Sequence, residues 1–398
     1  MSNKVVLAFS GGLDTSYCVK YLSQDKGLEV HGVLVNTGGF DDQELSDIEA
    51  RAKLLGVKTF TALNVEEEFY KRCVRYLIFG NVLKNNTYPL SVSAERVFQA
   101  MAIAKHAKLI KADYIAHGST GAGNDQVRFD MIFHTICPES EIITPIRDQN
   151  LSRQAEIDFL KKHGINFDWE KARYSINQGL WGTSVGGAET LTSDKYLPEE
   201  AFPSKLRDSE PQEIEIDFVK GEPVGLNGDQ LAPVELIKRL NNLGSDYAIG
   251  RDIHVGDTII GIKGRVGFEA PAPLILVKAH HTLEKHVLTK WQLQLKEQLT
   301  PWYGNLVHEG QFMEPALRDI EAYLENSQRN VTGKVKVQLN PHRFHVVGIE
   351  SVHDLMNSKF GAYGEINLGW TGEDVKGFSK IFGNQSQIYY QVNKHEFG

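Results

Sequence analysis

The sequence predicts an α/β protein that begins with a parallel sheet covered by helices and continues into an α+β domain and a C-terminal segment. Two observations support this fold class. As far as about Gly164, short apolar stretches alternate with longer helical patterns. Beyond that point the strand patterns acquire one polar face, which is typical of antiparallel sheets.

The first half alternates strand and helix patterns. The predicted strands are Val5–Phe9, Val30–Val35, Lys58–Leu63, Tyr114–His117 and Glu141–Thr144. The predicted helices are Tyr17–Ser23, Glu44–Leu55, Glu67–Phe79, Glu95–Ile110 and Gln126–Ile136. Asp41 and Glu44 fit the capping pair that starts a helix. Such alternation predicts a parallel sheet with helices on both faces, in which ligands bind beyond the carboxyl ends of the strands.

The second half is less regular at first. Residues 172–210 are rich in Gly, Ser, Thr and charges, and we expect a long functional loop region there. Further strands are predicted at Glu213–Lys220, Thr258–Ile262, Lys334–Leu339 and Arg343–Gly348, the last two as a hairpin. Further helices are predicted at Val234–Leu243, Leu274–Gln298 and Pro315–Ser327. The aromatic, polar tail at the end of the chain is expected to dock on a neighbouring subunit.

The amino-acid composition excludes several classes of function. The chain of 398 residues is long enough for more than one domain, each with its own core. Its formal net charge of −8 provides no overall basic field, so we expect no nucleic-acid partner. Cys18, Cys73 and Cys137 are scattered, which predicts reduced, mostly buried thiols. The N-terminus passes straight into a strand, and no apolar run is long enough to span a bilayer. We therefore expect a cytoplasmic protein without a signal peptide or a membrane partner.

The most informative stretch is Ala-Phe-Ser-Gly-Gly-Leu-Asp-Thr-Ser at residues 8–16, which follows the first predicted strand. Two glycines let the backbone turn sharply and leave N–H groups open to an anion. We expect Thr15 and Ser16 to cap the next helix, and the hydroxyl group of Ser10 to add a donor. Asp14 can reach a Mg²⁺ ion that bridges phosphates. No Lys follows the glycines, so this is not a P-loop, and an ordinary tight turn is the alternative interpretation.

A second polar stretch, residues 116–128, reads Ala-His-Gly-Ser-Thr-Gly-Ala-Gly-Asn-Asp-Gln-Val-Arg. A strand ends at His117, and Asn124 or Asp125 can cap a helix that carries Arg128. Asp125 and Arg128 project from the same side of that helix, and the planar guanidinium suits a carboxylate. A structural Gly-rich turn with a surface ion pair is the alternative. The position at the same sheet edge as the first loop favours the facing wall of one active site.

These two stretches, with Tyr-Pro-Leu-Ser-Val-Ser at residues 88–93 between them, resemble the argininosuccinate synthases, a family of pyrophosphate-loop ATP pyrophosphatases. The resemblance covers nearly the whole chain. It implies a Rossmann-like ATP-binding domain over residues 1–168, a synthetase domain over 169–355 and a C-terminal oligomerisation segment over 356–398. It also implies that citrulline and aspartate are joined with ATP and Mg²⁺, that AMP and diphosphate are released, and that the enzyme is a homotetramer of arginine biosynthesis.

The resemblance assigns residues to the three small-molecule substrates. ATP would be held by Ala8, Phe9, Ser10, Gly11, Gly12, Leu13, Asp14, Thr15, Ser16, Val35 and Gly118. Asp14 would be the catalytic residue and, through the phosphates, the Mg²⁺ ligand. Aspartate would be bound by Thr120, Asn124 and Asp125. Citrulline would be bound by Tyr88, Ser93, Asn124, Arg128, Ser175 and Ser184.

Two positions depart from the family pattern. Gly256 stands where the family has a Glu that helps to hold citrulline, and Phe268 stands where it has a Tyr. We expect Asp257 or Glu269 to supply the missing acceptor. The alternatives are that another loop substitutes, that the amino end of the acceptor is held differently, or that the substrate is a modified citrulline.

The implied mechanism passes through a citrullyl-adenylate. It requires alignment and charge neutralisation rather than a covalent nucleophile, so Cys18 is expected to serve packing. His117 either contacts a phosphate or is bonded structurally. His280, His281 and His286 are expected on a helix surface or at a subunit interface rather than at a metal.

Two other functions compete with this interpretation. A pyrophosphate-loop tRNA thiolase would need a pair of cysteines and a basic face, and the sequence has neither. A non-catalytic nucleotide-sensing module would leave the residues from Thr120 to Arg128 without a role.

Overall fold

The computed structural model describes residues 3–167, 173–358, 361 and 363–393, and its chain divides into two compact units, Met1–Val352 and His353–Gly398. The expected domain boundary between residues 168 and 169 lies outside the described residues and stays a prediction. Among the residues that are described, no helix is both long and apolar enough to cross a bilayer.

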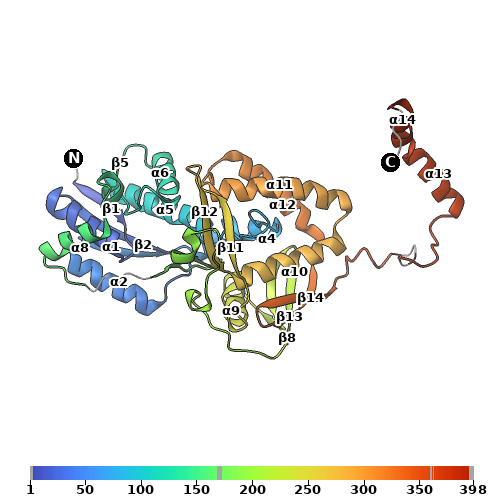
Figure 1. The fold of residues 1–398 in the computed structure, drawn as a ribbon, viewed down its shortest axis with the longest axis horizontal. Coiled ribbons are helices and arrows are strands. Elements are labelled where there is room, and N and C mark those ends of the chain that lie inside the picture. Colours follow the sequence, from blue (N-terminus) through green and yellow to red (C-terminus); the bar gives the residue numbers. More distant parts are fainter. Residues whose placement is uncertain (1–2, 168–172, 359–360, 362, 394–398) are drawn as a thin grey trace. The chain divides into compact units, whose positions relative to one another are not determined.

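The first unit begins with a parallel five-stranded sheet in the order β3-β2-β1-β4-β5 (Figure 1). Its strands are β1 (Lys4–Ala8), β2 (Glu29–Asn36), β3 (Thr59–Asn64), β4 (Tyr114–Ala116) and β5 (Glu141–Ile143). All the strands predicted for the first half are therefore confirmed, as is the parallel α/β class. Because successive side chains point to opposite faces, Val6 of β1 packs in one core while Val5 and Leu7 pack in another.

Helices cover both faces of this sheet. The helices on the Val6 side are α5 (Ser91–Ile110) and α6 (Asp125–Ile136), and those on the Leu7 side are α1 (Leu13–Lys20), α2 (Asp42–Leu55) and α8 (Arg153–Lys162). The expected Asp41–Glu44 capping box is present at the start of α2. The remaining helical segments are a π-turn at Tyr21–Asp25, α3 (Glu66–Phe69), a second π-turn at Tyr70–Val74, α4 (Arg75–Phe79) and α7 (Pro145–Asp148). The sequence did not indicate α8.

Two antiparallel sheets follow within the same unit. The first has the order β10-β9-β8-β13-β14 and consists of β8 (Gln212–Val219), β9 (Glu222–Leu226), β10 (Asp229–Gln230), β13 (Gly333–Asn340) and β14 (Arg343–Glu350). The second has the order β11-β12-β7-β6 and consists of β6 (Ser175–Asn177), β7 (Thr183–Gly186), β11 (Arg251–Asp257) and β12 (Lys263–Glu269). The accompanying helices are α9 (Pro233–Asp246), α10 (Pro271–Val287), α11 (Lys290–His308) and α12 (Pro315–Ser327).

Two predicted elements are wrong. Thr258–Ile262 is the turn of the β11–β12 hairpin rather than a strand, since the N–H of Thr258 donates to the carbonyl of Ile262 at 2.8 Å and Gly261 has φ +82°. The predicted helix Leu274–Gln298 is two helices. Leu288 adopts an extended conformation, and Thr289 caps α11 with a capping box, so a new helix starts inside the apolar pattern.

The three predicted buried cysteines are confirmed as buried, free thiols. The expectation for His280 is wrong, because its ring is fully buried and contacts Asn81 and Gln328 at 2.7 and 2.9 Å. Burial lowers the pKa of His280 to about 4, so the ring is neutral at neutral pH. Beside it the fully buried carboxylate of Glu284 pairs with Lys296, which is 3% exposed.

In the second unit, α13 (Gly372–Phe382) and α14 (Asn384–Asn393) contain no buried residue. Their large exposed apolar side chains include Phe378, Ile381, Phe382 and Ile388.

The buried Glu284–Lys296 pair leads to a stability prediction. Replacing Lys296→Met leaves a buried carboxylate without its counter-ion, which should lower the free energy of unfolding by about 3–5 kcal/mol. Adding Glu284→Gln removes the stranded charge and should restore part of that loss. Urea unfolding measures both, and Lys278→Met on the exposed side of α10 should stay within about 0.5 kcal/mol of the wild type. A loss no larger than that of the control would contradict a buried ionic pair.

Candidate active site

The loop that follows β1 lies at the point where the strand order reverses. The chain passes from β1 to β2 and β3 on one side, and then to β4 and β5 on the other. Loops after β1 and β4 therefore diverge and leave a crevice between the carboxyl ends of these two strands. A cavity of about 830 Å³ opens there, and both polar stretches singled out in the sequence contribute to its wall.

The first wall is the turn between β1 and α1. Gly11 has φ +77°, which favours glycine, and α1 begins at Leu13 without a side-chain cap. Thr15 and Ser16 do not cap the helix as expected. Their hydroxyl groups instead donate to the carbonyl of Gly12 at 3.2 and 2.8 Å. The N–H groups of the first turn are therefore not engaged by a capping side chain, which is the arrangement that attracts an anion.

Most of the expected ATP set lines the cavity: Ala8, Phe9, Ser10, Gly12, Leu13, Asp14, Thr15, Val35 and Gly118. Gly11 and Ser16 are outside the lining. A side chain at Gly11 would face Ile48 of α2, and Ser16 is fully buried beneath the turn. In this structure Gly11 and Ser16 shape the turn instead of lining the cavity.

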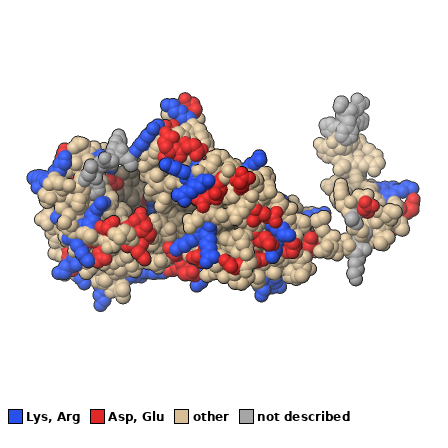
Figure 2. All heavy atoms as spheres, turned by 90° about the horizontal axis from the view of Figure 1, so that it is seen from below, with Lys and Arg blue, Asp and Glu red and all other residues tan. Residues whose placement is uncertain are grey.

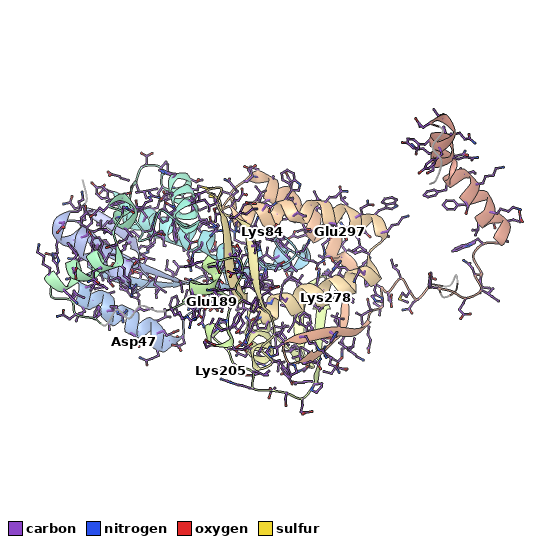
Figure 3. All side chains as sticks on the ribbon, viewed as in Figure 1. Asp47, Lys84, Glu189, Lys205, Lys278 and Glu297 are labelled. Carbon is purple, nitrogen blue, oxygen red and sulfur yellow. The ribbon has the colours of Figure 1, made fainter. Side chains whose placement is uncertain are left out.

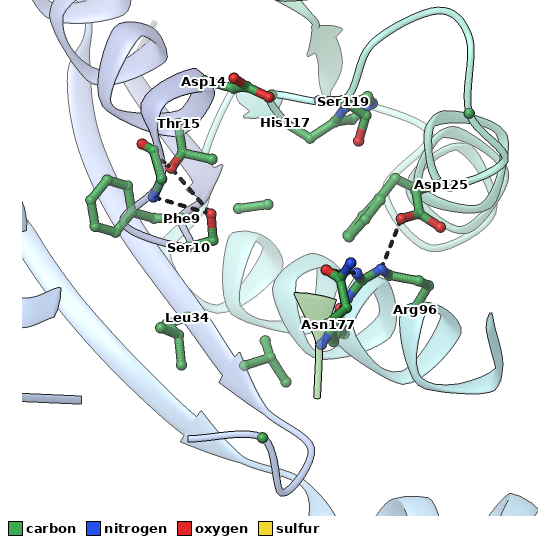
Figure 4. A pocket seen from close by; sticks show the side chains of 18 of the residues that line it. Phe9, Ser10, Asp14, Thr15, Leu34, Arg96, His117, Ser119, Asp125 and Asn177 are labelled. Atoms are coloured by element: carbon green, nitrogen blue, oxygen red, sulfur yellow. Dashed lines mark hydrogen bonds and ion pairs between the residues drawn. The ribbon is translucent and has the colours of Figure 1, made fainter. Parts of the chain in front are cut away.

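Asp14 faces the cavity from the first turn of α1 (Figure 4). Behind it lies Glu156 of α8, which is 3% exposed and close enough to Asp14 for the two carboxyl groups to interact. Burial and the adjacent charge of Asp14 raise the pKa of Glu156, so Glu156 holds its proton more tightly than an exposed Glu. The negative charge that favours a cation at this place is therefore that of Asp14.

The second wall is the loop between β4 and α6, which closes tightly on the first. A Cβ atom at Gly118 would lie 3.3 Å from the backbone and the Cβ of Asp14, so the two loops meet where only glycine leaves enough room. His117 is buried, its Nε2 contacts Asp130 at 2.9 Å, and its Nδ1 accepts from the N–H of Ser119. These bonds favour the structural interpretation of His117, because both ring nitrogens are engaged.

A network of charged groups crosses the floor of the cavity. The carboxylate of Asp125 accepts from Arg96 at 2.9 Å and from Arg128 at 2.8 Å, and Arg96 also donates to Asn177 of β6 (Figure 4). Burial alone would raise the pKa of Asp125, but the two guanidinium groups lower it below its usual value. Asp125 is therefore a firmly ionised carboxylate at the cavity, and the expectation that Asp125 and Arg128 project from the same side of α6 is confirmed by their ion pair.

The guanidinium of Arg128 is less open than the sequence suggests. It is 3% exposed, and its Nε and Nη2 both donate to the carbonyl of His308 at 2.9 and 2.7 Å. Together with the bond to Asp125, three of its N–H groups are engaged within the chain. The guanidinium therefore already binds a carboxylate of this chain, which leaves one N–H on each terminal nitrogen, and its expected role toward the carboxylate of citrulline stays a prediction.

The other residues expected to bind citrulline lie around this network. Ser175 lines the cavity, whereas Tyr88, Ser93 and Ser184 are buried outside its lining. Ser93 donates to the carbonyl of Leu90 at the start of α5. Ser175 and Ser184 share one face of the β11-β12-β7-β6 sheet, because Ser184 is paired with Asn177, two residues beyond Ser175.

Thr120 and Asn124 complete the expected aspartate set. Thr120 lines the cavity with Asp125. Asn124 does not line it, and its Oδ1 accepts from the N–H of Ile259 in the β11–β12 turn at 2.9 Å. Asn124 therefore connects the second wall of the cavity to the antiparallel sheet.

Both parts of the chain match family models of one enzyme. The model described as the Arginosuccinate synthase N-terminal HUP domain matches residues 4–166, and that of the Arginosuccinate synthase C-terminal domain matches residues 174–389. The chain belongs to the argininosuccinate synthase family. Proteins of this family are ATP-dependent ligases that form a carbon–nitrogen bond, so the chain is an enzyme of that kind.

Full-length relatives support the assignment. The argininosuccinate synthase of Methanocaldococcus jannaschii is 37% identical over 100% of both chains. That of Dictyoglomus turgidum is 39% identical over 97% of each chain, and that of Pyrococcus furiosus is 37% identical over 98% of this chain and 95% of its own.

The structure answers one question raised by the departures from the argininosuccinate synthase pattern. Neither expected substitute faces Tyr88. Asp257 is exposed and pairs with Lys263 at 2.7 Å. Glu269 is buried and pairs with Arg251, whereas the neighbouring Phe268 packs on Tyr88, so the two point to opposite faces of β12. The expectation that Asp257 or Glu269 supplies the acceptor is therefore not supported by their positions.

A histidine occupies the space beside Gly256 instead. A Cβ atom at Gly256 would lie 2.5 Å from Nε2 of His254, whose ring stacks on Tyr88 with centroids 5.1 Å apart. Burial, and then the positive charge of Lys84, lower the pKa of His254, so the imidazole is neutral at neutral pH. Lys84 lies beside the β11–β12 hairpin (Figure 3). The site thus presents a neutral ring where the family pattern has a carboxylate.

Sequence reasoning missed Arg96, Glu156 and Asn177. Arg96 sits inside a predicted helix whose pattern says nothing about which face meets the cavity. Glu156 lies on α8. Ser152 is the N-cap of this helix, and its hydroxyl oxygen accepts from the N–H of Ala155. That cap, followed by an amphipathic stretch, is the signal that would have found the helix.

The close approach at Gly118 predicts a loss of nucleotide affinity. In Gly118→Ala, the new methyl group must push the two loops apart, at a cost of about 1–3 kcal/mol, which raises the Kd for ATP at least about fivefold. Isothermal titration with ATP measures the change. Gly123→Ala in the same loop is the matched control, since nothing lies within 4 Å of its Cβ position. Equal affinities of the two variants would refute the close packing of the loops.

Proposed function

We propose that this enzyme joins citrulline to aspartate with ATP, forming argininosuccinate, AMP and diphosphate in arginine biosynthesis. The family assignment supports the reaction. One observation supports placing this reaction in the cavity. The glycine-rich loop after β1 and the loop of residues 117–124 face one another across it. Neither the tRNA thiolase nor the non-catalytic module requires such a pair of walls.

In the proposed mechanism the ureido oxygen of citrulline attacks the α-phosphorus of ATP and expels diphosphate. The resulting citrullyl-adenylate is attacked at the ureido carbon by the amine of aspartate, and AMP leaves. The chain contributes orientation and electrostatic stabilisation rather than a nucleophile. The open N–H groups at the start of α1 would bind the phosphates, and Val35 would lie beside the base.

The residues at Asp14 fit a Mg²⁺ ion. A magnesium ion bound with phosphates takes only one or two protein carboxylates, and Asp14 with Glu156 behind it offers that number. Within the described part of the chain, no larger group of metal-ligating side chains is present. Asp14 would hold the ion, which when bound neutralises phosphate charge, while the protonated Glu156 orients the carboxylate of Asp14.

The amino-acid substrates would lie on either side of the Asp125 network. The aspartate set is Thr120, Asn124 and Asp125, with the ionised Asp125 suited to an ammonium group. The citrulline set is Tyr88, Ser93, Asn124, Arg128, Ser175 and Ser184. Arg128 would use its two remaining N–H groups toward the acceptor or move away from the His308 carbonyl.

We also propose a cytoplasmic homotetramer. The exposed apolar side chains of α13 and α14 are of the kind that become buried in subunit interfaces. A nucleic-acid partner is not proposed, because on the face seen in Figure 2 basic and acidic side chains are interspersed rather than separated.

Release of pyrophosphate tests the proposed reaction. With ATP and Mg²⁺, we expect release only when both citrulline and aspartate are present, or slow release with citrulline alone. The same assay with an Nα-acylated citrulline tests the acceptor, and we expect free citrulline to be preferred. ATP binding without turnover would favour the non-catalytic module, and better use of the acylated substrate would overturn the assignment of the acceptor.

The role of Asp14 leads to a second kinetic prediction. Asp14→Asn should lower kcat by about 10²–10³-fold, because it removes a charge that acts on the transferring phosphates. Circular dichroism should show an unchanged fold. Asp41→Asn, a charge change in the α2 capping box outside the cavity lining, is a suitable control. Near-normal turnover of Asp14→Asn at saturating Mg²⁺ would show that Asp14 does not hold the ion.

A further inference from the structure

A second carboxyl group lies behind the cavity and has no part in the mechanism above. Glu95 of α5 is 1% exposed, and its carboxyl group sits between two loops. Its Oε2 accepts from the hydroxyl of Thr37 at 2.9 Å, and the backbone of Trp181 lies close enough to lower the pKa of the carboxyl group. Its Oε1 is buried without a hydrogen-bond partner. A buried polar group in this condition is costly and indicates a constraint other than stability alone.

The two loops that meet at Glu95 are residues 37–40, after β2, and residues 178–182, before β7. They touch backbone to backbone. The N–H of Leu180 donates to the carbonyl of Thr37 at 2.9 Å, and a Cβ atom at Gly39 would lie 2.1 Å from the carbonyl oxygen of Gln178. Gly179 lies against Glu95 itself, since its Cβ position is 1.8 Å from Oε1. The carboxyl group therefore occupies the space that a side chain at residue 179 would need.

Both loops contribute to the wall of the nucleotide cavity. Gly39 and Phe40 line it from the first loop, and Gln178 lines it from the second. Arg96, the residue after Glu95, donates to Asn177, the last residue of β6, directly before the second loop (Figure 4). Consecutive residues of α5 thus contact this segment at two points, Arg96 at Asn177 and Glu95 at Gly179.

The surroundings of Glu95 favour the neutral carboxyl group. Burial raises the pKa of Glu95 to about 8, while the hydrogen bond from Thr37 and the charge of Arg96 act in the opposite direction. Arg96 is the charged group that acts on Glu95, and the groups facing it from the two loops, Thr37 and Trp181, are uncharged. In this closed arrangement the carboxyl group of Glu95 therefore keeps its proton to a higher pH than an exposed Glu does.

We propose that Glu95 is a positioning residue for the ATP site, whose neutral carboxyl group holds the loops 37–40 and 178–182 together and thereby fixes one wall of the cavity. This inference rests on the proposed binding of ATP in the cavity. Ionised Glu95 is stable only if water reaches it, which requires the loops to separate. The nucleotide should then bind less well, while the chemistry of bound substrates is less affected.

The affinity of the site for ATP is expected to depend on pH through the protonation of Glu95. A carboxyl group whose pKa is raised in the closed arrangement favours that arrangement at low pH, and the advantage is lost as the pH rises through the raised value. Closure should weaken by up to about tenfold per pH unit between the ordinary pKa of an exposed Glu, about 4.3, and the raised value of about 8, and should level off above it. The KM for ATP should rise in proportion, and kcat should change less.

The first experiment compares the pH profile of the KM for ATP in the wild type and in Glu95→Gln. Gln keeps the shape of the side chain and remains neutral, so its KM should show no rise from this site over roughly pH 5–8, where the wild type should show one. Because Glu156 titrates in both proteins, the difference between the profiles is the signal. Thr37→Val removes the donor to Oε2 and should raise the KM for ATP at every pH.

The second experiment uses the contact between Glu95 and Gly179. Gly179→Ala should raise the KM for ATP, because the methyl group overlaps the carboxyl group. Combining it with Glu95→Ala removes the overlap and should return part of the lost affinity. Gly186→Ala is the matched control, since nothing lies within 4 Å of its Cβ position.

Melting temperatures of all variants separate a local change from general loss of folding. A rise of KM in Glu95→Gln equal to that of the wild type, or a double variant no better than Gly179→Ala, would overturn the inference. A wild type that binds no ATP at all would instead refute the proposed function, so the two failures are distinguishable.

Discussion

The reversal of strand order between β1 and β4 is the constraint on which the rest of the site depends. Because the chain leaves β1 and β4 toward opposite sides, the loops after these two strands diverge at first. They then face one another across one crevice. The meeting is so close that a Cβ atom at Gly118 would lie 3.3 Å from the backbone of Asp14. Open N–H groups, a carboxylate and the Asp125 network therefore converge from segments that are far apart in the sequence. Each wall alone would be an ordinary turn.

Electrostatics divides this crevice into two regions. Around Asp14 the chain places the carboxyl group of Glu156, whose pKa is raised, so the negative charge that favours a cation or a phosphate-bound metal there is that of Asp14. Around Asp125 it places two guanidinium groups, which keep that carboxylate ionised while restricting the freedom of Arg96 and Arg128. The first region suits a polyphosphate with its counter-ion, and the second suits zwitterionic amino acids. Such separation allows three charged substrates to occupy neighbouring places with limited mutual repulsion.

Much of the candidate ATP site could be predicted from the sequence, because the residues that form it are close together in the chain. The strand, the two glycines and the following helix lie within residues 4–20, and the second wall lies within residues 114–136. The remainder depends on pairing between distant segments. Arg128 is oriented by a carbonyl at His308, and the faces of Phe268 and Glu269 are decided by the register with Ser184 and Thr183. No local pattern reveals these partners. Likewise, the apolar stripe of Leu274–Gln298 continues across Leu288, where a change of backbone conformation divides it into two helices.

One feature of the fold bears on how such an enzyme can change over time. The core that receives Val6 of β1 also contains Phe98 of α5, Leu276 of α10 and Val335 of β13, so it runs from the parallel sheet into the antiparallel part. Helix α5 of the first half of the chain thus packs in the same core as α10 and β13 of the second half. Exchange of one half with that of an unrelated protein would leave unmatched apolar surfaces on both sides. The two halves are therefore expected to be inherited together.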